Sequence, residues 1–529
     1  MFKKKDNNDS VQKIVERNTG LNTEELLKKH NQPYIHNLKE AVKLLLKHKN
    51  EEIHIIGDYD VDGISATLIM LYGLFMAGIP AKYRLPRRFS EGYGLSEKII
   101  DEITNGVVIT VDNGIAAHNA IKKAKKKGLT VIVTDHHQAV IENEHPLLTD
   151  ADIIVNPSIE NKSEFHSLCG AGIAYYFVKE LLGKDVIELL IMASIATVAD
   201  VMPLIGVNRD LVKYGLNAIN HGYGIPGILT LLEAAKKDVV TEDDFGFFLG
   251  PILNASGRLL DQGAERTLEF LLMSSKNEKL EEAACKFIAM NGCRKNITKK
   301  AIQSSEEEYK GERPIVIYNP NLGEGIIGLV AGELCEKYQC PVICFTKMKN
   351  GLLKGSGRSI PKIHLKNTLD KIKHILVGYG GHAGAAGLTI KEENLNLFKA
   401  NFTAACGSIP AFCKDTFYDL EISEKEVPEI IEQLKLYAPY GEGNEKITFR
   451  IKCNVNKEKF RKIGDGTHIM HYSPSLKIIG FNKSKQFDDL INEKGYPSVL
   501  DCVGYLSESW FQNQCTYQLE LLNFEGIYE

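Results

Sequence analysis

The sequence predicts an α/β fold whose first domain is a doubly wound, mainly parallel sheet, and its alternating pattern is the main reason. Short apolar runs rich in β-branched residues recur between residues 50 and 160, as expected of strands that are buried on both faces. Helical patterns near 64–78 and 115–127 separate these runs. Such alternation is typical of a parallel sheet with helices on both faces. The expected strands are Ile53–Ile56, Val107–Val111, Val131–Thr134 and Ile153–Val155.

The pattern changes twice farther along the chain. Helical periodicity covers 167–200 and 208–220, and a long polar helix or a pair of helices fits 262–310. A second α/β pattern begins at Pro314, and β-like runs follow Asp415, as in a small antiparallel barrel or sandwich. We therefore expect an α/β domain at 1–235, a connecting helical region at 236–312, a second α/β domain at 313–412 and a β domain at 413–529.

The composition is that of an ordinary globular protein. The chain has 529 residues, of which 44% are hydrophobic and 25% charged. A formal net charge of −4 argues against a strong overall attraction to nucleic acid, although a local basic groove would still bind it. The 11 cysteines include no C-x-x-C pair. We read them as reduced thiols and expect a cytoplasmic protein.

One uncharged segment, from Ile64 to Ala81, approaches the length of a membrane span. We expect it to be a buried helix, because acidic residues stand directly before it and two glycines interrupt it. The basic start MFKKK is followed by no apolar stretch, so it does not resemble a signal peptide. The sequence therefore predicts no membrane association.

Acidic and imidazole side chains follow three successive strands of the predicted sheet. The carboxyl ends of parallel strands share one edge, so these groups should converge there. A further aspartate lies at the end of the helical stretch that covers 167–200. The residues are Asp58, Asp60 and Asp62 after the first strand, Asp112 after the second, Asp135, His136 and His137 after the third, and Asp200.

So many carboxylates cannot converge without a counter-charge, because like charges raise each other's pKa. Carboxylate oxygens mixed with imidazole suit Mn²⁺, with Mg²⁺ as an alternative. Two such ions would activate a water and hold phosphate oxygens during in-line displacement. Each motif alone is more often a turn or a solvated loop. Their occurrence at three strand ends is what indicates a site.

These motifs resemble, in order, the four signatures of the DHH phosphoesterases. They are Asp58–Gly63 (D-Y-D-V-D-G), Asp112–Gly114 (D-N-G), Thr134–His137 (T-D-H-H) and Val198–Asp200 (V-A-D). Many family members carry a histidine where Ile56 stands here. The absence of this histidine, together with the nearby Asp58, resembles the pattern of the RecJ branch.

The resemblance implies a role for each residue. One ion would be held by Asp58, Asp60 and Asp112, and the other by Asp62, Asp112, His136 and Asp200, with Asp112 as the bridge. His137 would act on the scissile phosphate as a catalytic residue, and Asp135 would orient a neighbouring histidine.

Similarity to the family continues downstream. The run Leu253–Arg258 resembles its N-A-x-G-R segment, and Gly355–Ser359 with Gly380–Gly387 resembles its DHH-associated domain. Glycine lets backbone N–H groups approach a phosphate, and arginine offers paired donors. The resemblance implies binding of a 5′ phosphate by Arg258, Ser356, Arg358, Gly381, His382 and Gly384.

The tail resembles the OB-fold of the same family, a β-barrel that binds single strands by charge and aromatic stacking. The stacking candidates are Phe449, Phe481, Tyr505, Trp510 and Phe511, and barrel core is the alternative for each.

The resemblance implies a single-stranded-DNA-specific 5′–3′ exonuclease that uses two Mn²⁺ ions and releases 5′-mononucleotides. Single-stranded DNA would be its substrate, DNA repair and recombination its setting, and a single-strand-binding protein or a helicase its partner. Two alternatives stay open: a nanornase or cyclic-dinucleotide phosphodiesterase, and a non-catalytic nucleic-acid-binding scaffold.

Overall fold

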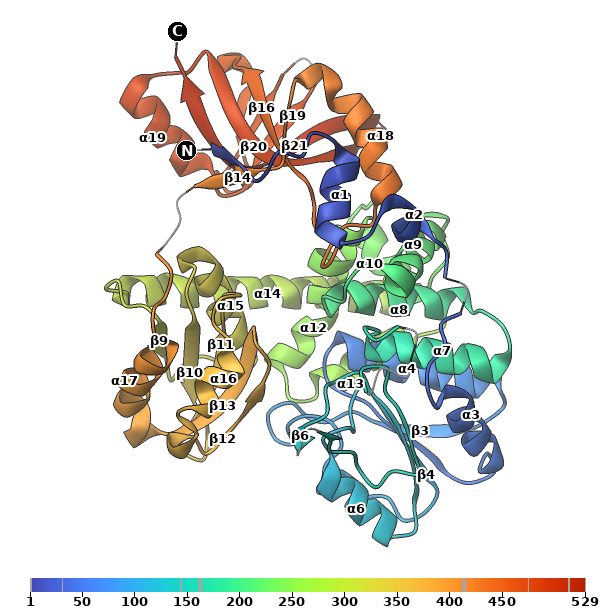
Figure 1. The fold of residues 1–529 in the computed structure, drawn as a ribbon. Coiled ribbons are helices and arrows are strands. Elements are labelled where there is room, and N and C mark those ends of the chain that lie inside the picture. Colours follow the sequence, from blue (N-terminus) through green and yellow to red (C-terminus); the bar gives the residue numbers. More distant parts are fainter. Residues whose placement is uncertain are drawn as a thin grey trace. The chain divides into compact units, whose positions relative to one another are not determined.

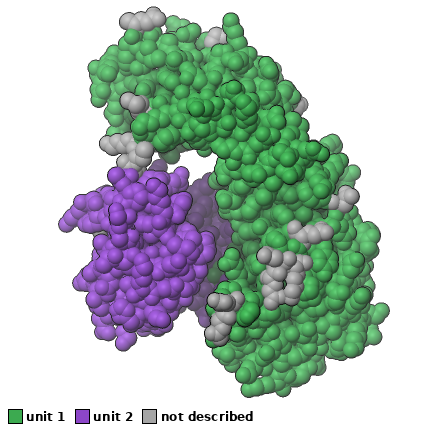
Figure 2. Space-filling view, viewed as in Figure 1, with its two compact units in different colours: residues 1–84, 95–250, 414–529 green, residues 85–94, 251–413 purple. Residues whose placement is uncertain are grey.

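The computed structural model describes residues 2–30, 32–142, 145–159, 163, 165–411, 415–473, 475–511 and 514–528, without the side chains at 308 and 511. The chain divides into two compact units, coloured separately in Figure 2. Unit 1 comprises Met1–Arg84, Leu95–Gly250 and Lys414–Glu529, and unit 2 comprises Leu85–Gly94 and Pro251–Cys413.

Unit 1 contains a five-stranded sheet in the order β3-β2-β4-β5-β8. All neighbouring strands run parallel, which confirms the predicted fold class. The first strand in sequence, β2, lies inside the sheet, and later strands extend the sheet on both sides of it, as in doubly wound folds. The strands are β2 (Ile53–Ile56), β3 (Ala81–Arg84), β4 (Val107–Val111), β5 (Thr130–Thr134) and β8 (Ile153–Val155).

Helices cover both faces of this sheet. On one face, α5 and α6 pack their apolar residues against β4 and β5. On the other, α4 packs against α7, and its residues from Val61 to Met70 are buried throughout. Among the described residues, no helix has the length and apolar character needed to cross a bilayer. The helices are α3 (Leu38–Lys47), α4 (Val61–Met76), α5 (Glu97–Asp101), α6 (His118–Lys126), α7 (Gly170–Leu182), α8 (Ile187–Ala199), α9 (Gly206–Asn220) and α10 (Pro226–Ala234).

Unit 2 contains a mixed five-stranded sheet in the order β12-β13-β11-β10-β9, in which only β9 and β10 run parallel. The expected helical region before it is a pair, α13 and α14, and α14 is the long helix in Figure 1. The elements are α12 (Gly250–Leu259), α13 (Gly263–Leu271), α14 (Glu278–Glu308), β9 (Ile315–Tyr318), α15 (Ile327–Tyr338), β10 (Val342–Lys347), β11 (Leu352–Arg358), α16 (Leu365–Asp370), β12 (Gly378–Gly381), β13 (Ala385–Lys391) and α17 (Leu395–Cys406).

The C-terminal part of unit 1 is a seven-stranded sheet in the order β15-β16-β20-β21-β19-β18-β17. Most pairs are antiparallel as predicted, but β15–β16 and β19–β21 run parallel. The elements are β15 (Leu420–Ile422), α18 (Val427–Tyr437), β16 (Thr448–Asn454), β17 (Phe460–Ile463), β18 (His468–Tyr472), β19 (Lys477–Gly480), α19 (Ser484–Lys494), β20 (Val499–Phe511) and β21 (Gln514–Ile527).

The aromatic stacking candidates of this sheet differ in exposure. Phe449 is fully buried in the core, so its alternative as barrel core is the one observed. Phe481 is 45% and Trp510 43% exposed, which leaves both accessible to a base. Tyr505 is half-buried. The side chain of Phe511 lies outside the described part of the structure.

The first residues of the chain pack against the C-terminal sheet, not against the sheet that follows them in sequence. Strand β1 (Phe2–Lys4) pairs in parallel with β14 (Thr416–Tyr418), and Figure 1 shows the blue N-terminal segment beside orange strands and helices. The helices α1 (Val11–Thr19) and α2 (Thr23–Leu27) add apolar residues to the C-terminal core. The sequence-based division at 235 assigned this segment to the first domain.

A buried carboxylate fastens this segment. Asp419 accepts hydrogen bonds from Lys5 at 2.9 Å, from Arg17 at 2.6 Å and from the Thr448 hydroxyl at 2.6 Å. Burial alone would raise the pKa of Asp419, but the bonds from Thr448, Arg17 and Lys5 prevail and hold it below 3.8.

We expect Asp419→Asn to lower the free energy of unfolding by about 3 kcal/mol at pH 7, because it breaks a buried charge network. A depressed carboxyl pKa stabilises the fold above the unfolded value of 3.8, so this difference should shrink as the pH falls below it. Denaturant unfolding followed by fluorescence of the single tryptophan, Trp510, measures it. The matched control is Asp415→Asn, which removes a more exposed pair with Lys3. Equal losses in both variants would contradict the assignment.

Candidate functional site

The first acidic motif lies where β2 ends and α4 begins. Asp60 is the N-cap of α4, and its Oδ1 accepts the N–H groups of Asp62 and Gly63, each at 3.1 Å. Asp58 is fully buried. A Cβ at Gly63 would lie 2.6 Å from the Cβ of Asp58, so only glycine fits. The chain thus brings three aspartates into one short turn at the sheet edge.

Asp112 follows β4 in a left-handed conformation, with φ 61°. Its N–H donates to the Thr134 carbonyl at 3.0 Å, which fixes it at the end of the adjacent strand. The next residue, Asn113, is fully buried and donates to the carbonyls of Ile56 and Val111 at 3.0 and 2.9 Å. The Asn113 amide therefore ties the ends of β2 and β4 together.

The amino end of α7 reaches the same edge, which no sequence motif predicted. The N–H groups of Gly170 and Ala171 donate to the two carboxylate oxygens of Asp62, at 2.7 and 2.8 Å. A Cβ at Gly170 would lie 2.4 Å from that of Asp112. The glycines around position 170 were the available signal, because close backbone approach requires a missing side chain.

His136 faces the carboxylates. Its Nε2 lies 3.1 Å from Asp112 Oδ1, 3.7 Å from Asp62 Oδ2 and 3.7 Å from Asp200 Oδ2. Burial lowers the pKa of His136 below its usual range, so its neutral, metal-ligating form is favoured.

His137 is paired differently. Asp135 accepts from His137 Nδ1 at 2.8 Å and is itself fixed by the Ile115 N–H at 2.9 Å. Burial disfavours the charged ring, but the hydrogen bond and the charge of Asp135 prevail and raise the pKa of His137 to about 9. The side chain of His137 is 44% exposed, so this cationic ring borders solvent. Asp135 thus orients the ring of His137, and it also accepts the backbone N–H of His136 at 2.8 Å.

The six predicted ligands gather in groups of metal-binding dimensions. One group is the first predicted set in full, and a second is the other predicted set without Asp112. A third contains His137, which the resemblance keeps apart from the ions. The groups are Asp58, Asp60 and Asp112; Asp62, His136 and Asp200; and Asp112, His136 and His137.

The electrostatics of this cluster favour a cation. Burial and then the charges of Asp62, Asp60, Asp58 and Asp200 hold the pKa of Asp112 well above its usual range. Burial and the charges of Asp62 and Asp60 do the same for Asp200. A divalent cation would remove this repulsion, and carboxylate oxygens with an imidazole are donors that fit Mn²⁺ or Mg²⁺.

The predicted phosphate-binding residues of unit 2 lie on neighbouring strands. Ser356 and Arg358 belong to β11, which pairs with β13, and Gly381 ends β12 on the far side of β13. The Ser359 N–H donates to the Gly384 carbonyl at 2.9 Å. The charge of Arg358 contributes to lowering the pKa of His382, after burial, so these two side chains are close.

Arg258 joins this group through the loop before α15. Its guanidinium donates to the Gly325 carbonyl at 3.4 Å. A Cβ at Gly328, in the first turn of α15, would lie 2.9 Å from Ser356 Oγ and 3.4 Å from an Arg358 nitrogen. A helix amino terminus, a hydroxyl and a guanidinium therefore meet at one place, an arrangement suited to phosphate. The sequence had left this loop without a role.

The loop that follows β3 belongs to unit 2. Asp261 accepts the N–H groups of Phe89 and Ser90 at 2.9 and 3.2 Å, and the Ser90 hydroxyl at 2.7 Å. The sequence gave no signal for this contact, because the partners are 171 residues apart.

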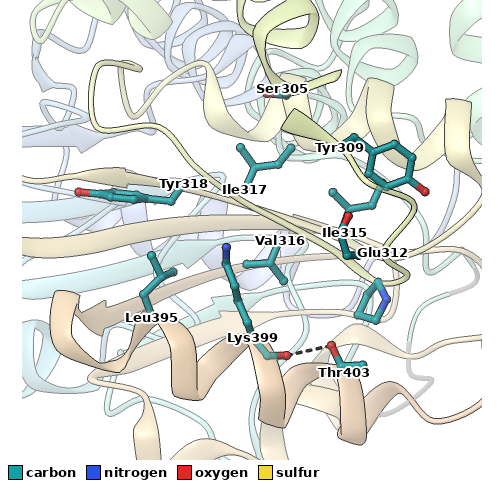
Figure 3. A pocket seen from close by; sticks show the side chains of 11 residues that line it. Ser305, Tyr309, Glu312, Ile315, Val316, Ile317, Tyr318, Leu395, Lys399 and Thr403 are labelled. Atoms are coloured by element: carbon teal, nitrogen blue, oxygen red, sulfur yellow. Dashed lines mark hydrogen bonds between the residues drawn. The ribbon is translucent and has the colours of Figure 1, made fainter. Parts of the chain in front are cut away.

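A separate pocket of about 340 Å³ lies along β9, which is the edge strand of the unit 2 sheet (Figure 3). Its walls are apolar side chains of β9 and parts of α14 and α17, including Val316, Leu395 and Lys399. Arg258, Ser356 and Arg358 are not among its lining residues in the described part of unit 2. The pocket is thus separate from the predicted phosphate site.

Three family models match the chain in order. They are the N-terminal domain of the DHH family at residues 52–199, the DHHA1 domain at 312–408 and the RecJ OB domain at 418–523.

Curated relatives match over most of the chain. The single-stranded-DNA-specific exonuclease RecJ of Haemophilus influenzae is 34% identical, covering 93% of this chain and 89% of that protein. Its namesake in Salmonella typhimurium is 33% identical, covering 69% and 68%. A crystal structure of RecJ from Thermus thermophilus with Mn²⁺ has a TM-score of 0.80 at 25% identity, covering 97% of this chain and 76% of that one.

We expect Gly170→Ala to disturb the carboxylate cluster, because its methyl group would overlap Asp112. Overpacking of this kind costs about 1–3 kcal/mol, and Mn²⁺ binding should weaken about tenfold or more. Titration calorimetry of the full chain with Mn²⁺ measures this. Gly172→Ala is the control, since its nearest contact would be the Leu168 side chain at 3.3 Å. Similar Mn²⁺ affinities in the two variants would count against the proposed crowding.

Proposed function

This chain belongs to the RecJ family of single-stranded-DNA-specific exonucleases, and we propose that it hydrolyses single-stranded DNA from the 5′ end, releasing 5′-mononucleotides. The observation that carries the proposal is the cluster of carboxylates and imidazole at the edge of the parallel sheet. Repair and recombination of DNA are the setting we propose for it. The division into domains at 235, 312 and 412 also stays a proposal.

We propose that two divalent cations bind this cluster, with Mn²⁺ as the preferred ion. Asp58, Asp60 and Asp112 would hold one, and the second would be held by Asp112 together with Asp62, His136 and Asp200. Support comes from the burial of Asp112 beside other carboxylates, chiefly Asp62 and Asp60, which together raise its pKa. Crystal structures of Thermus thermophilus RecJ with Mn²⁺ and with Mg²⁺ support the choice of ions.

When bound, the cations would supply Lewis acidity toward the phosphate oxygens and lower the pKa of a water. His137 would offset the negative charge of the phosphate or protonate the leaving oxygen, as its partly exposed cationic ring allows. Asp135 would hold the ring through its hydrogen bond to Nδ1. Gly170 and Ala171 would keep Asp62 in place through their N–H groups.

We propose that the 5′ phosphate binds in unit 2, beside Ser356, Arg358 and Arg258. The supporting observation is that Gly328 of α15 approaches both Ser356 and Arg358. Gly381, His382 and Gly384 would form the adjacent turn. A phosphate held there would select strands by their 5′ end.

Asp112→Ala should abolish Mn²⁺-dependent hydrolysis, because both proposed ions lose a ligand. The assay digests single strands labelled at the 5′ or the 3′ end, with RNA, duplex DNA and a dinucleotide alongside. Wild type should release label from the 5′ end first. Earlier loss of the 3′ label would contradict the proposed 5′–3′ direction of digestion. Faster cleavage of the dinucleotide than of long strands would favour a nanornase. Asp101→Ala, which removes an exposed pair with Lys123, is the control and should keep full activity.

Arg358→Ala should reduce the preference for 5′-phosphorylated over 5′-hydroxyl strands by about tenfold or more, since a charged hydrogen bond to phosphate is lost. The rates on both substrates give this ratio at saturating Mn²⁺. Arg313→Ala is a control in the same unit, because Arg313 binds the carbonyls of Tyr338 and Gln339. An unchanged ratio in Arg358→Ala would remove Arg358 from the phosphate site.

A further inference from the structure

The first turn of α9 carries a buried amide that connects two separate segments of unit 1. Asn208 is fully buried. Its Nδ2 donates to the Ser167 carbonyl at 2.6 Å and to the Pro203 carbonyl at 3.1 Å. Ser167 lies between β8 and α7, and Pro203 lies between α8 and α9, both outside regular secondary structure. One side chain therefore fixes the spacing between two loops.

Both loops border the carboxylate cluster. The first leads from Ser167 into α7, whose first N–H groups hold both oxygens of Asp62. The second runs from Asp200 to Pro203, and Val201 within it has a left-handed φ of 56°. A shift of either loop would move Asp62 or Asp200 relative to the other.

We infer that Asn208 is a positioning residue of the metal centre, which sets the distance between the Asp62 and Asp200 carboxylates. This inference rests on the proposed function, in which both residues hold one ion. Asn208 would touch neither substrate nor ion, and would act only through the two carbonyls. Residues that orient ligands in this way typically change metal affinity by about 10–100-fold.

The C-terminal part of unit 1 supports the same loop. The Leu204 N–H donates to the Glu442 carbonyl at 2.7 Å. A Cβ at Gly441 would lie 2.8 Å from Leu204 Cδ1, so the turn containing Gly441 packs closely on the segment after Asp200. The turn is itself braced by the buried Asn444, whose Nδ2 donates to the Pro439 carbonyl at 2.9 Å.

Arg209, next to Asn208, continues this connection. Its guanidinium is buried and donates to the carbonyls of Leu436 and Ala438 at 3.2 and 2.9 Å. These carbonyls lie at the end of α18, directly before the turn. The start of α9 thus joins the metal-binding loops on one side to the C-terminal sheet region on the other.

A bland explanation is that Asn208 contributes only to stability, as any buried amide does. Ser194 provides a matched comparison. It is fully buried in α8, and its hydroxyl donates to the Leu211 carbonyl of α9 at 2.6 Å. Replacing it also removes a buried hydrogen bond to α9, without touching Ser167 or Pro203.

The test measures Mn²⁺ binding to the full chain after chelator treatment, by calorimetry and by the electron paramagnetic resonance of free Mn²⁺. Thermal unfolding without metal is recorded beside it. Asn208→Ala should bind Mn²⁺ about tenfold or more weakly, and raised Mn²⁺ should restore hydrolysis. Ser194→Ala should keep its Mn²⁺ affinity within about twofold, although it also loses stability.

Wild-type Mn²⁺ affinity in Asn208→Ala, with only thermal stability reduced, would overturn the inference. Should that variant fail to fold, Gly441→Ala decides: it should weaken Mn²⁺ binding, and Leu204→Ala in the same chain should recover part of the loss. Unchanged affinity in Gly441→Ala would also overturn the inference. If the wild type itself binds no Mn²⁺, the proposed metal centre is wrong, and the role inferred for Asn208 is wrong with it.

Discussion

The repulsion among buried carboxylates around Asp112 is the constraint on which this structure depends. Little water reaches these groups, so their mutual repulsion is screened weakly. The chain answers part of it with backbone N–H groups in fixed positions, at Gly170 and Ala171 for Asp62 and at Ile115 for Asp135. The repulsion that remains would be offset by divalent cations. Glycine at 63 and 170 follows from the same crowding, since a side chain at either position would overlap an aspartate.

The sequence predicted the parts of the fold that local pattern encodes. Four of the five strands of the parallel sheet are short apolar runs, and β2, β4 and β8 have the predicted bounds. The fifth, β3, carries Lys82 and Arg84 and was not predicted. Because acidic residues follow β2, β4 and β5, the shared strand edge was enough to bring them together. In unit 2, Ser356, Arg358 and Gly381 gather for the same reason, since they lie on strands next to β13. The chemical roles of these residues stay predictions.

Contacts between distant segments could not be predicted. A peptide N–H is common to every residue except proline, so nothing marked those of Gly170 and Ala171 as partners of Asp62, 108 residues earlier in the chain. Nothing in the sequence predicted the hydrogen bonds between the loop at 85–94 and Asp261. Proximity in sequence suggested the first domain for the amino-terminal segment, whereas the apolar face of α1 packs in the C-terminal core.

The pairing of β1 with β14 has a consequence for how the protein is made. Lys5 and Asp419 are 414 residues apart, so the segment that contains β1 leaves the ribosome long before the partners that it packs against are translated. At 5–20 residues per second the delay is roughly 20–80 s. During this delay the apolar face of α1 is not yet packed in its native core, so it is accessible to chaperones and proteases. This segment therefore folds long after it is synthesised.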